Sequence, residues 1–84
     1  LFVLNGEFVR RQAESLTARL YREAPGGGGA RIELAYKLLY GRLVTKDEIA
    51  MARSFLALEG ASDRENWQRY AQALLASNEF LFVD

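Results

Sequence analysis

The chain has no cysteine and no histidine among its 84 residues. These absences exclude thiolate nucleophiles, zinc held by cysteine and histidine, haem ligation by histidine, and Ser-His-Asp catalysis. No apolar run approaches the roughly 20 residues that a membrane-spanning helix needs. No signal peptide is visible, and the chain begins at Leu1 rather than at a methionine. We therefore expect a piece of a longer polypeptide with no cofactor, no metal and no catalytic residue of its own.

An excess of charge of one sign is also missing, because 11 basic residues balance 11 acidic ones. A nucleic-acid surface normally concentrates lysine and arginine on one face. The first half of the chain is slightly more basic than the second. A polyanion site would need its arginines to converge, namely Arg10, Arg11, Arg19, Arg22 and Arg31. Since the asymmetry is mild, we expect solvated helix faces, with neither nucleic acid nor membrane as a partner.

Proline occurs once, and it opens the glycine run at residues 25–29. Half of all residues are apolar, and they recur at three- and four-residue spacing with no sustained alternation typical of a strand. The spacing predicts helices over about 6–23, 30–40, 46–59 and 63–76. Residues 25–29 are predicted to form a flexible loop rather than a phosphate-binding loop, because no strand precedes them and Ala30-Arg31 replaces Lys-Ser/Thr.

Capping residues support these boundaries. Thr45 to Glu48 and Ser62 to Glu65 each have the spacing of a capping box, in which a hydroxyl and a carboxylate satisfy free amides at a helix start. Asn78 is expected to cap a final helical turn that holds Phe80 and Phe82. The sequence thus predicts one all-α domain over residues 1–84, a compact bundle of about four helices with short loops and a final C-terminal turn.

The turn near residue 41 contains the most specific structural residues. Gly41 suits a left-handed helix end, and Thr45 and Glu48 start the next helix. Arg42 has a guanidinium fork that suits bidentate pairing with a carboxylate, either Glu48 or Glu79. We expect Gly41, Arg42, Thr45, Glu48, Asn78 and Glu79 to have structural rather than catalytic roles.

Aromatic side chains allow two interpretations. If these side chains are exposed, they could contact a carbohydrate or a protein partner. Aromatic residues at helical spacing, however, more often form the core. The residues concerned are Tyr36, Tyr40, Trp67, Tyr70, Phe80 and Phe82. Near the two ends of the chain, Phe2, Phe8 and Phe82 are the candidates for contact with a partner, because terminal apolar residues need a cover.

Three segments carry a family resemblance: 4–9 (Leu-Asn-Gly-Glu-Phe-Val), 39–48 with its Gly-Arg-x-x-Thr-x-x-Glu turn, and 73–84 with its Ser-Asn-Glu-Phe-Leu ending. Together they resemble the planctomycete-type "PSD" domain of unknown function. That domain is the C-terminal module of large exported bacterial proteins that also carry cytochrome-c-like segments. The resemblance implies a periplasmic or extracellular location and assigns no catalytic residue.

The first function hypothesis is a non-catalytic structural or interaction module of such a protein, whose partners are other domains of the parent or another protein. The alternative is an accessory domain of a polysaccharide-acting enzyme that supplies aromatic contacts to substrate. Exposure of Trp67, Tyr36 or Tyr40 would favour the alternative, and their burial would favour the module. The sequence leaves the oligomeric state open.

Overall fold

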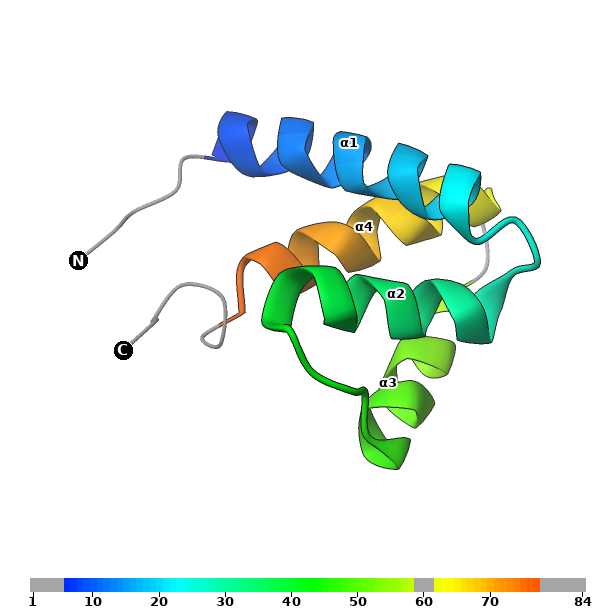
Figure 1. Ribbon diagram of the computed structural model, residues 1–84. Coiled ribbons are helices and arrows are strands. Elements are labelled where there is room, and N and C mark those ends of the chain that lie inside the picture. The colour runs from blue at the N-terminus through cyan, green and yellow to red at the C-terminus, as the bar shows by residue number, and fades with distance from the viewer. Residues whose placement is uncertain (1–5, 59–61, 78–84) are drawn as a thin grey trace.

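The computed structural model describes residues 6–58 and 62–77, which form an all-α bundle of four helices (Figure 1). Their bounds are Gly6–Glu23 for α1, Gly28–Tyr40 for α2, Lys46–Leu56 for α3 and Asp63–Leu75 for α4. The predicted fold class is confirmed. The final turn expected after Asn78 lies outside the described residues.

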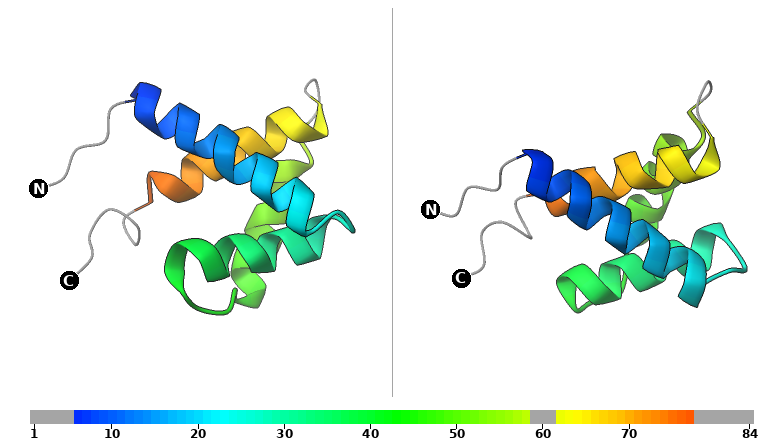
Figure 2. Two further views of the ribbon diagram at one scale, coloured as in Figure 1. Left: turned by 45° about the horizontal axis from the view of Figure 1, so that its top comes forward. Right: turned by 90° about the horizontal axis from the view of Figure 1, so that it is seen from above.

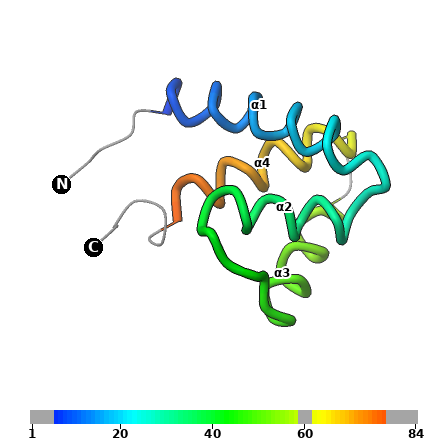
Figure 3. Tube along the Cα trace, in the orientation of Figure 1, coloured from blue at the N-terminus to red at the C-terminus, as the bar shows by residue number. Residues whose placement is uncertain are grey.

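Helices α1 and α4 pack against each other and form the main contact of the bundle, and both views in Figure 2 show them crossing at an angle. Helix α2 packs against α1, and α3 runs steeply away from α2 and contacts α4 (Figure 1). The chain trace in Figure 3 shows that each helix contacts the next one, as short connections require. Helix α4 then returns to α1 and closes the bundle.

The core draws buried side chains from all four helices. Its main cluster consists of Leu20, Ile32, Ala35, Tyr36, Ala52, Trp67, Tyr70 and Leu74. A smaller cluster lies between α1 and α4, where Ala13 and Ala71 are both almost fully buried beside Leu75. Small side chains at these positions let the two helices approach closely. Thr17, also fully buried, satisfies its hydroxyl by donating to the Ala13 carbonyl at 2.8 Å.

Helix α2 begins at Gly28, two residues earlier than the apolar spacing predicts. Gly27 precedes it with a φ of 107°, which residues with a Cβ rarely adopt, and its carbonyl accepts from the Arg31 amide at 3.1 Å. The end of the glycine run is therefore the first turn of a helix and not a loop. The sequence prediction missed this because the apolar period starts only at Ile32 and glycine has the weakest helix propensity after proline.

Helix α3 ends at Leu56, three residues before the predicted end. Asn66 of α4 is buried beside this end, and its side-chain amide donates to the carbonyls of Leu56 at 3.4 Å and Leu58 at 2.9 Å. A side chain from another helix therefore binds carbonyls that the helix leaves unpaired at its end. Local spacing gives no indication of such a long-range cap.

Gly41 occupies the left-handed region, with a φ of 66°, as its position after α2 predicts. A Cβ added here would meet no heavy atom within 4 Å, so the cost of a substitution is confined to the backbone. We expect Gly41→Ala to lower the free energy of unfolding by about 1 kcal/mol, measured by urea denaturation. Gly6→Ala, at an ordinary φ and equally open, is the matched control and should not destabilise the domain. Equal midpoints for the wild type and Gly41→Ala would contradict the prediction.

Candidate functional site

The turn between α2 and α3 brings four of the predicted residues together. The Arg42 guanidinium pairs with the Glu48 carboxylate in a bidentate arrangement, with Nη1–Oε1 at 2.9 Å and Nη2–Oε2 at 2.7 Å. Glu48 Oε1 also accepts from the Thr45 amide at 2.9 Å, while the Glu48 amide donates to Thr45 Oγ1 at 3.2 Å. The first capping box is thus complete. Glu48 and Glu79 were the two predicted partners of Arg42, and the structure shows the pair with Glu48.

The second capping box is observed in its serine half, since the Ser62 hydroxyl accepts from the Glu65 amide at 3.1 Å. Asn78 and Glu79 lie outside the described residues, as do Phe2 and Phe82. Phe8 lies on α1 and is exposed, as a contact with a partner requires. Its partner-facing role stays a prediction.

The Arg42–Glu48 pair carries a strong electrostatic signature. Hydrogen bonding from Arg42, reinforced by Thr45, lowers the pKa of Glu48 from 4.5 to about 2, against the opposing effect of burial. The Arg42 guanidinium carbon also lies 5.4 Å from the ring centre of Tyr36 and 5.5 Å from that of Tyr40, within cation–π range. The turn is therefore anchored to the aromatic side chains of α2.

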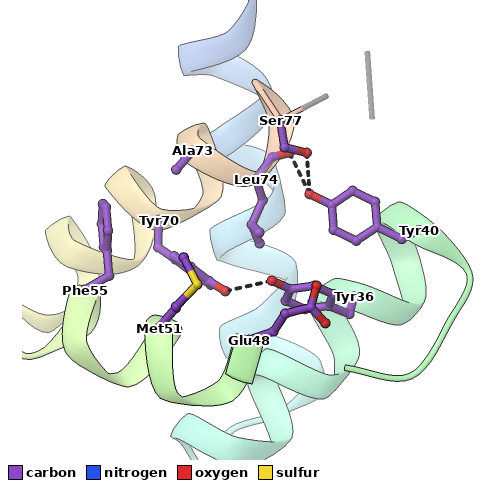
Figure 4. Close-up of a pocket in the computed structure, with 9 residues that line it drawn as sticks. All are labelled: Tyr36, Tyr40, Glu48, Met51, Phe55, Tyr70, Ala73, Leu74 and Ser77. Atoms are coloured by element: carbon purple, nitrogen blue, oxygen red, sulfur yellow. Dashed lines mark hydrogen bonds between the residues drawn. The ribbon is translucent and has the colours of Figure 1, made fainter. Parts of the chain in front are cut away.

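Beside this turn lies a groove of about 320 Å³, which α2, α3 and the end of α4 enclose (Figure 4). We call it the aromatic groove. Its lining consists of Tyr36, Tyr40, Glu48, Met51, Phe55, Tyr70, Ala73, Leu74 and Ser77. Most of these side chains are aromatic or aliphatic, which suits an apolar ligand.

Hydroxyl groups in the groove are bound to one another or to the backbone. The Tyr40 hydroxyl donates to the Leu74 carbonyl and lies 2.8 Å from Ser77 Oγ. Tyr70 donates to the Tyr36 hydroxyl at 3.4 Å. Burial, followed by this hydrogen bond, raises the pKa of Tyr70, which keeps the phenol neutral. Among the nine lining residues, Glu48 is the single carboxylate, and Arg42 holds it.

The apolar surface continues across α3. A second hollow lies on the outer face of this helix, lined by Ala50, Met51, Ser54, Phe55 and Leu58. Met51 and Phe55 line both hollows. Met51 is 72% exposed, although it is a large apolar residue. The two hollows therefore form one apolar surface with Met51 at its centre.

A second cluster of polar groups joins α1, α2 and α4 at the opposite end of α2. Arg31 is only 9% exposed, and its guanidinium lies 3.8 Å above the Tyr21 ring. Its Nε donates to the Ala24 carbonyl at 3.0 Å, and Asp63 lies 3.7 Å from its Nη1. Burial and the hydrogen bond that Tyr21 donates to Asp63 raise the pKa of Tyr21 to about 12. Arg31 was expected on a solvated helix face, and that prediction is wrong. Local spacing does not indicate this cluster, because its contacts join three helices.

Two other arginines of the basic half form ion pairs with glutamates of their own helix. Arg10 pairs with Glu7 and Glu14, both at 2.6 Å. Arg19 pairs with Glu23, also at 2.6 Å. These i,i+3 and i,i+4 pairs match positive with negative charge along α1. The expectation that nucleic acid is not a partner stays a prediction.

We expect the Arg42–Glu48 pair to make the free energy of unfolding of the domain depend on pH in the acidic range. Because the folded-state pKa of Glu48 is lowered, its contribution is complete above pH 4.5 and is lost as the pH falls toward 2. The partly solvated pair should contribute up to about 1 kcal/mol. Glu48→Gln should lower the free energy of unfolding by this amount at pH 7. Between pH 5 and pH 2 the variant should lose less of its free energy of unfolding than the wild type does, because it has no carboxylate to protonate at this position. Urea denaturation at several pH values measures both; parallel pH curves for wild type and variant would contradict the assignment.

Comparison of the chain with protein-family models, with curated proteins and with solved structures found no match. In residues 6–58 and 62–77, no helix has the length and apolarity needed to cross a bilayer. The same residues contain no group of three or more metal-ligating side chains. The resemblance to the PSD-type domain stays a prediction.

Proposed function

We propose that this domain is a non-catalytic interaction module of a larger exported bacterial protein. It binds an apolar segment of the parent's other domains, or of a partner protein, in the aromatic groove. The proposal depends mainly on one observation: the groove is apolar and continues directly onto the exposed Met51. Exposed apolar side chains beside a groove are typical of surfaces that contact another protein.

Burial of the aromatic side chains supports a module over a carbohydrate platform. Trp67 is 2% exposed and Tyr36 is 6% exposed, so neither presents a ring face on which a sugar could stack. Tyr40 is half-buried and its hydroxyl is bound to the end of α4. The aromatic rings therefore form the core and the groove wall rather than a flat exposed surface.

The chemistry of the groove also supports binding rather than catalysis. Catalysis by a carboxylate needs a group that can exchange a proton near neutral pH. Glu48 has a pKa of about 2 and remains ionised in its pair with Arg42. Tyr70 stays protonated because burial raises its pKa. The groove therefore offers a ligand an apolar surface of defined shape and not a group that transfers protons near neutral pH.

Selection from a displayed peptide library tests this proposal. The wild-type chain should enrich short peptides with adjacent aromatic and aliphatic side chains. Their affinity for Met51→Glu should fall at least about tenfold, because the variant places a charge in the apolar contact. Isothermal titration with synthetic versions of the enriched peptides measures the change.

Leu43→Glu is the matched control, because Leu43 is 89% exposed but does not line the groove. This variant adds the same charge at an exposed apolar position and should bind the peptides as the wild type does. The proposal fails if no peptide is enriched, or if the two variants lose affinity equally.

A further inference from the structure

We propose that the C-terminal segment of this chain, residues 79–84, is an intramolecular ligand of the aromatic groove and competes there with an external partner. The inference rests on the proposed function, because it takes the groove as the docking site. The segment has the sequence Glu-Phe-Leu-Phe-Val-Asp, with four consecutive apolar residues between two acidic ones. It is thus itself a short apolar segment of the kind that the groove suits.

The path of the chain places the start of this segment at the groove. Ser77 lines the groove, and its amide donates to the Leu74 carbonyl at 3.2 Å. The Tyr40 hydroxyl contacts both Ser77 Oγ and the Leu74 carbonyl, as Figure 4 shows. These contacts fasten the end of α4 to α2, so the part of the chain that the structure describes ends at the groove wall.

Distance and chain length favour an intramolecular contact. An extended chain advances at most about 3.3–3.6 Å per residue, so the reach from Ser77 is no more than about 11 Å to Phe80 and about 18 Å to Phe82. A short tether also gives the segment an effective concentration in the millimolar range. Even a weak contact is then populated, without any rearrangement of the four helices.

The size and chemistry of the groove suit side chains of this kind. Its volume of about 320 Å³ is at the lower end of the range for ligand pockets, and it matches one or two large side chains better than a whole helix. Phe55 and Tyr40 are only partly buried and offer ring surfaces, and aromatic pairs gain from offset or edge-to-face contact. Met51 adds a flexible thioether that packs favourably against aromatic rings.

The single methionine of the chain provides a direct probe. In the full chain labelled with [methyl-¹³C]methionine, the Met51 methyl should show nuclear Overhauser effects to ring protons of Phe80 or Phe82. In Phe80→Ser/Phe82→Ser these effects should vanish, and the methyl resonance should move toward the position of a solvated methionine. Leu43→Ser, which removes a large apolar side chain that is 89% exposed and does not line the groove, is the matched control and should leave the resonance in place.

A competition measurement provides the second readout. The peptides enriched against the groove should bind Phe80→Ser/Phe82→Ser more tightly than the wild type. The gain is about tenfold if the segment occupies the groove nine-tenths of the time. Addition of a synthetic peptide of residues 78–84 to the variant should restore the wild-type Met51 shift.

Three results would overturn the inference. One is the absence, in the wild-type chain, of nuclear Overhauser effects between the Met51 methyl and the rings of Phe80 and Phe82. This result does not depend on how any variant folds. Another is equal peptide affinity for the wild type and the double variant, which would leave the proposed function standing and remove the intramolecular ligand alone. The third is a Met51 shift that changes with protein concentration together with a doubled mass in light scattering, which would make a second copy the occupant. If no enriched peptide shifts Met51 in either protein, the proposed function fails as well.

Discussion

Replacing Trp67 by alanine is expected to unfold a large fraction of the molecules at room temperature. Trp67 is 2% exposed and lies in the main core cluster, with its ring 5.8 Å from that of Tyr70. Truncation of a buried tryptophan costs about 3–5 kcal/mol through lost burial and the cavity left behind. Domains are stable by about 5–15 kcal/mol, and one as small as this belongs to the lower part of that range. The substitution therefore removes much of the total stability.

Urea denaturation followed by far-UV circular dichroism measures this effect, since the variant lacks the only tryptophan and its fluorescence. Leu43→Ala is the control, because Leu43 is a large apolar side chain that is 89% exposed. Its midpoint should stay close to that of the wild type, within about 0.5 kcal/mol. A Trp67→Ala midpoint equal to that of the control would show that the ring does not lie in the core.

The second large effect is expected at Arg31. Arg31→Ala should lower the free energy of unfolding by about 2–3 kcal/mol, because it removes the stacking on Tyr21 and the donor to the Ala24 carbonyl. The same substitution removes a positive charge that lowers the pKa of Tyr21. The phenol of Tyr21 should therefore titrate at higher pH in the variant than in the wild type.

Two further variants separate the geometry of Arg31 from its charge. Arg31→Lys keeps the charge but not the planar fork, so it should recover only part of the lost stability. Arg22→Ala removes an arginine whose side chain is 70% exposed and should change stability by no more than about 0.5 kcal/mol. Equal denaturation midpoints for Arg31→Ala and Arg22→Ala would contradict the buried cluster that the structure shows.

The burial of Arg31 also affects how the charge pattern is interpreted. An arginine that binds a carbonyl and an aromatic ring inside the fold does not contribute to a positive surface, whatever its neighbours in sequence. Arg10 and Arg19 likewise pair with glutamates one helical turn away. Arg10, Arg19 and Arg31 of the more basic first half are therefore each held by a partner within the fold.

The sequence by itself determined the features that arise within a few residues. Helix α1 has its predicted bounds, and α3 and α4 start where their capping residues indicate. The left-handed Gly41 followed from the spacing of the turn, and Glu48 was one of the two carboxylates that the sequence offered to Arg42. Such contacts join residues separated by at most six positions, so local propensity, capping and apolar period are sufficient to predict them.

Only the tertiary structure decided the features that join distant parts of the chain. Asn66 lies ten residues from the carbonyl of Leu56 that it binds, and Tyr40 lies 34 residues from Leu74. The aromatic groove likewise combines side chains of α2, α3 and α4. Helix periodicity shows which face of each helix is apolar, but not which faces meet or how much of a face stays uncovered. Those outcomes depend on how the helices pack together, because only packing decides which side chains and backbone groups lose contact with water.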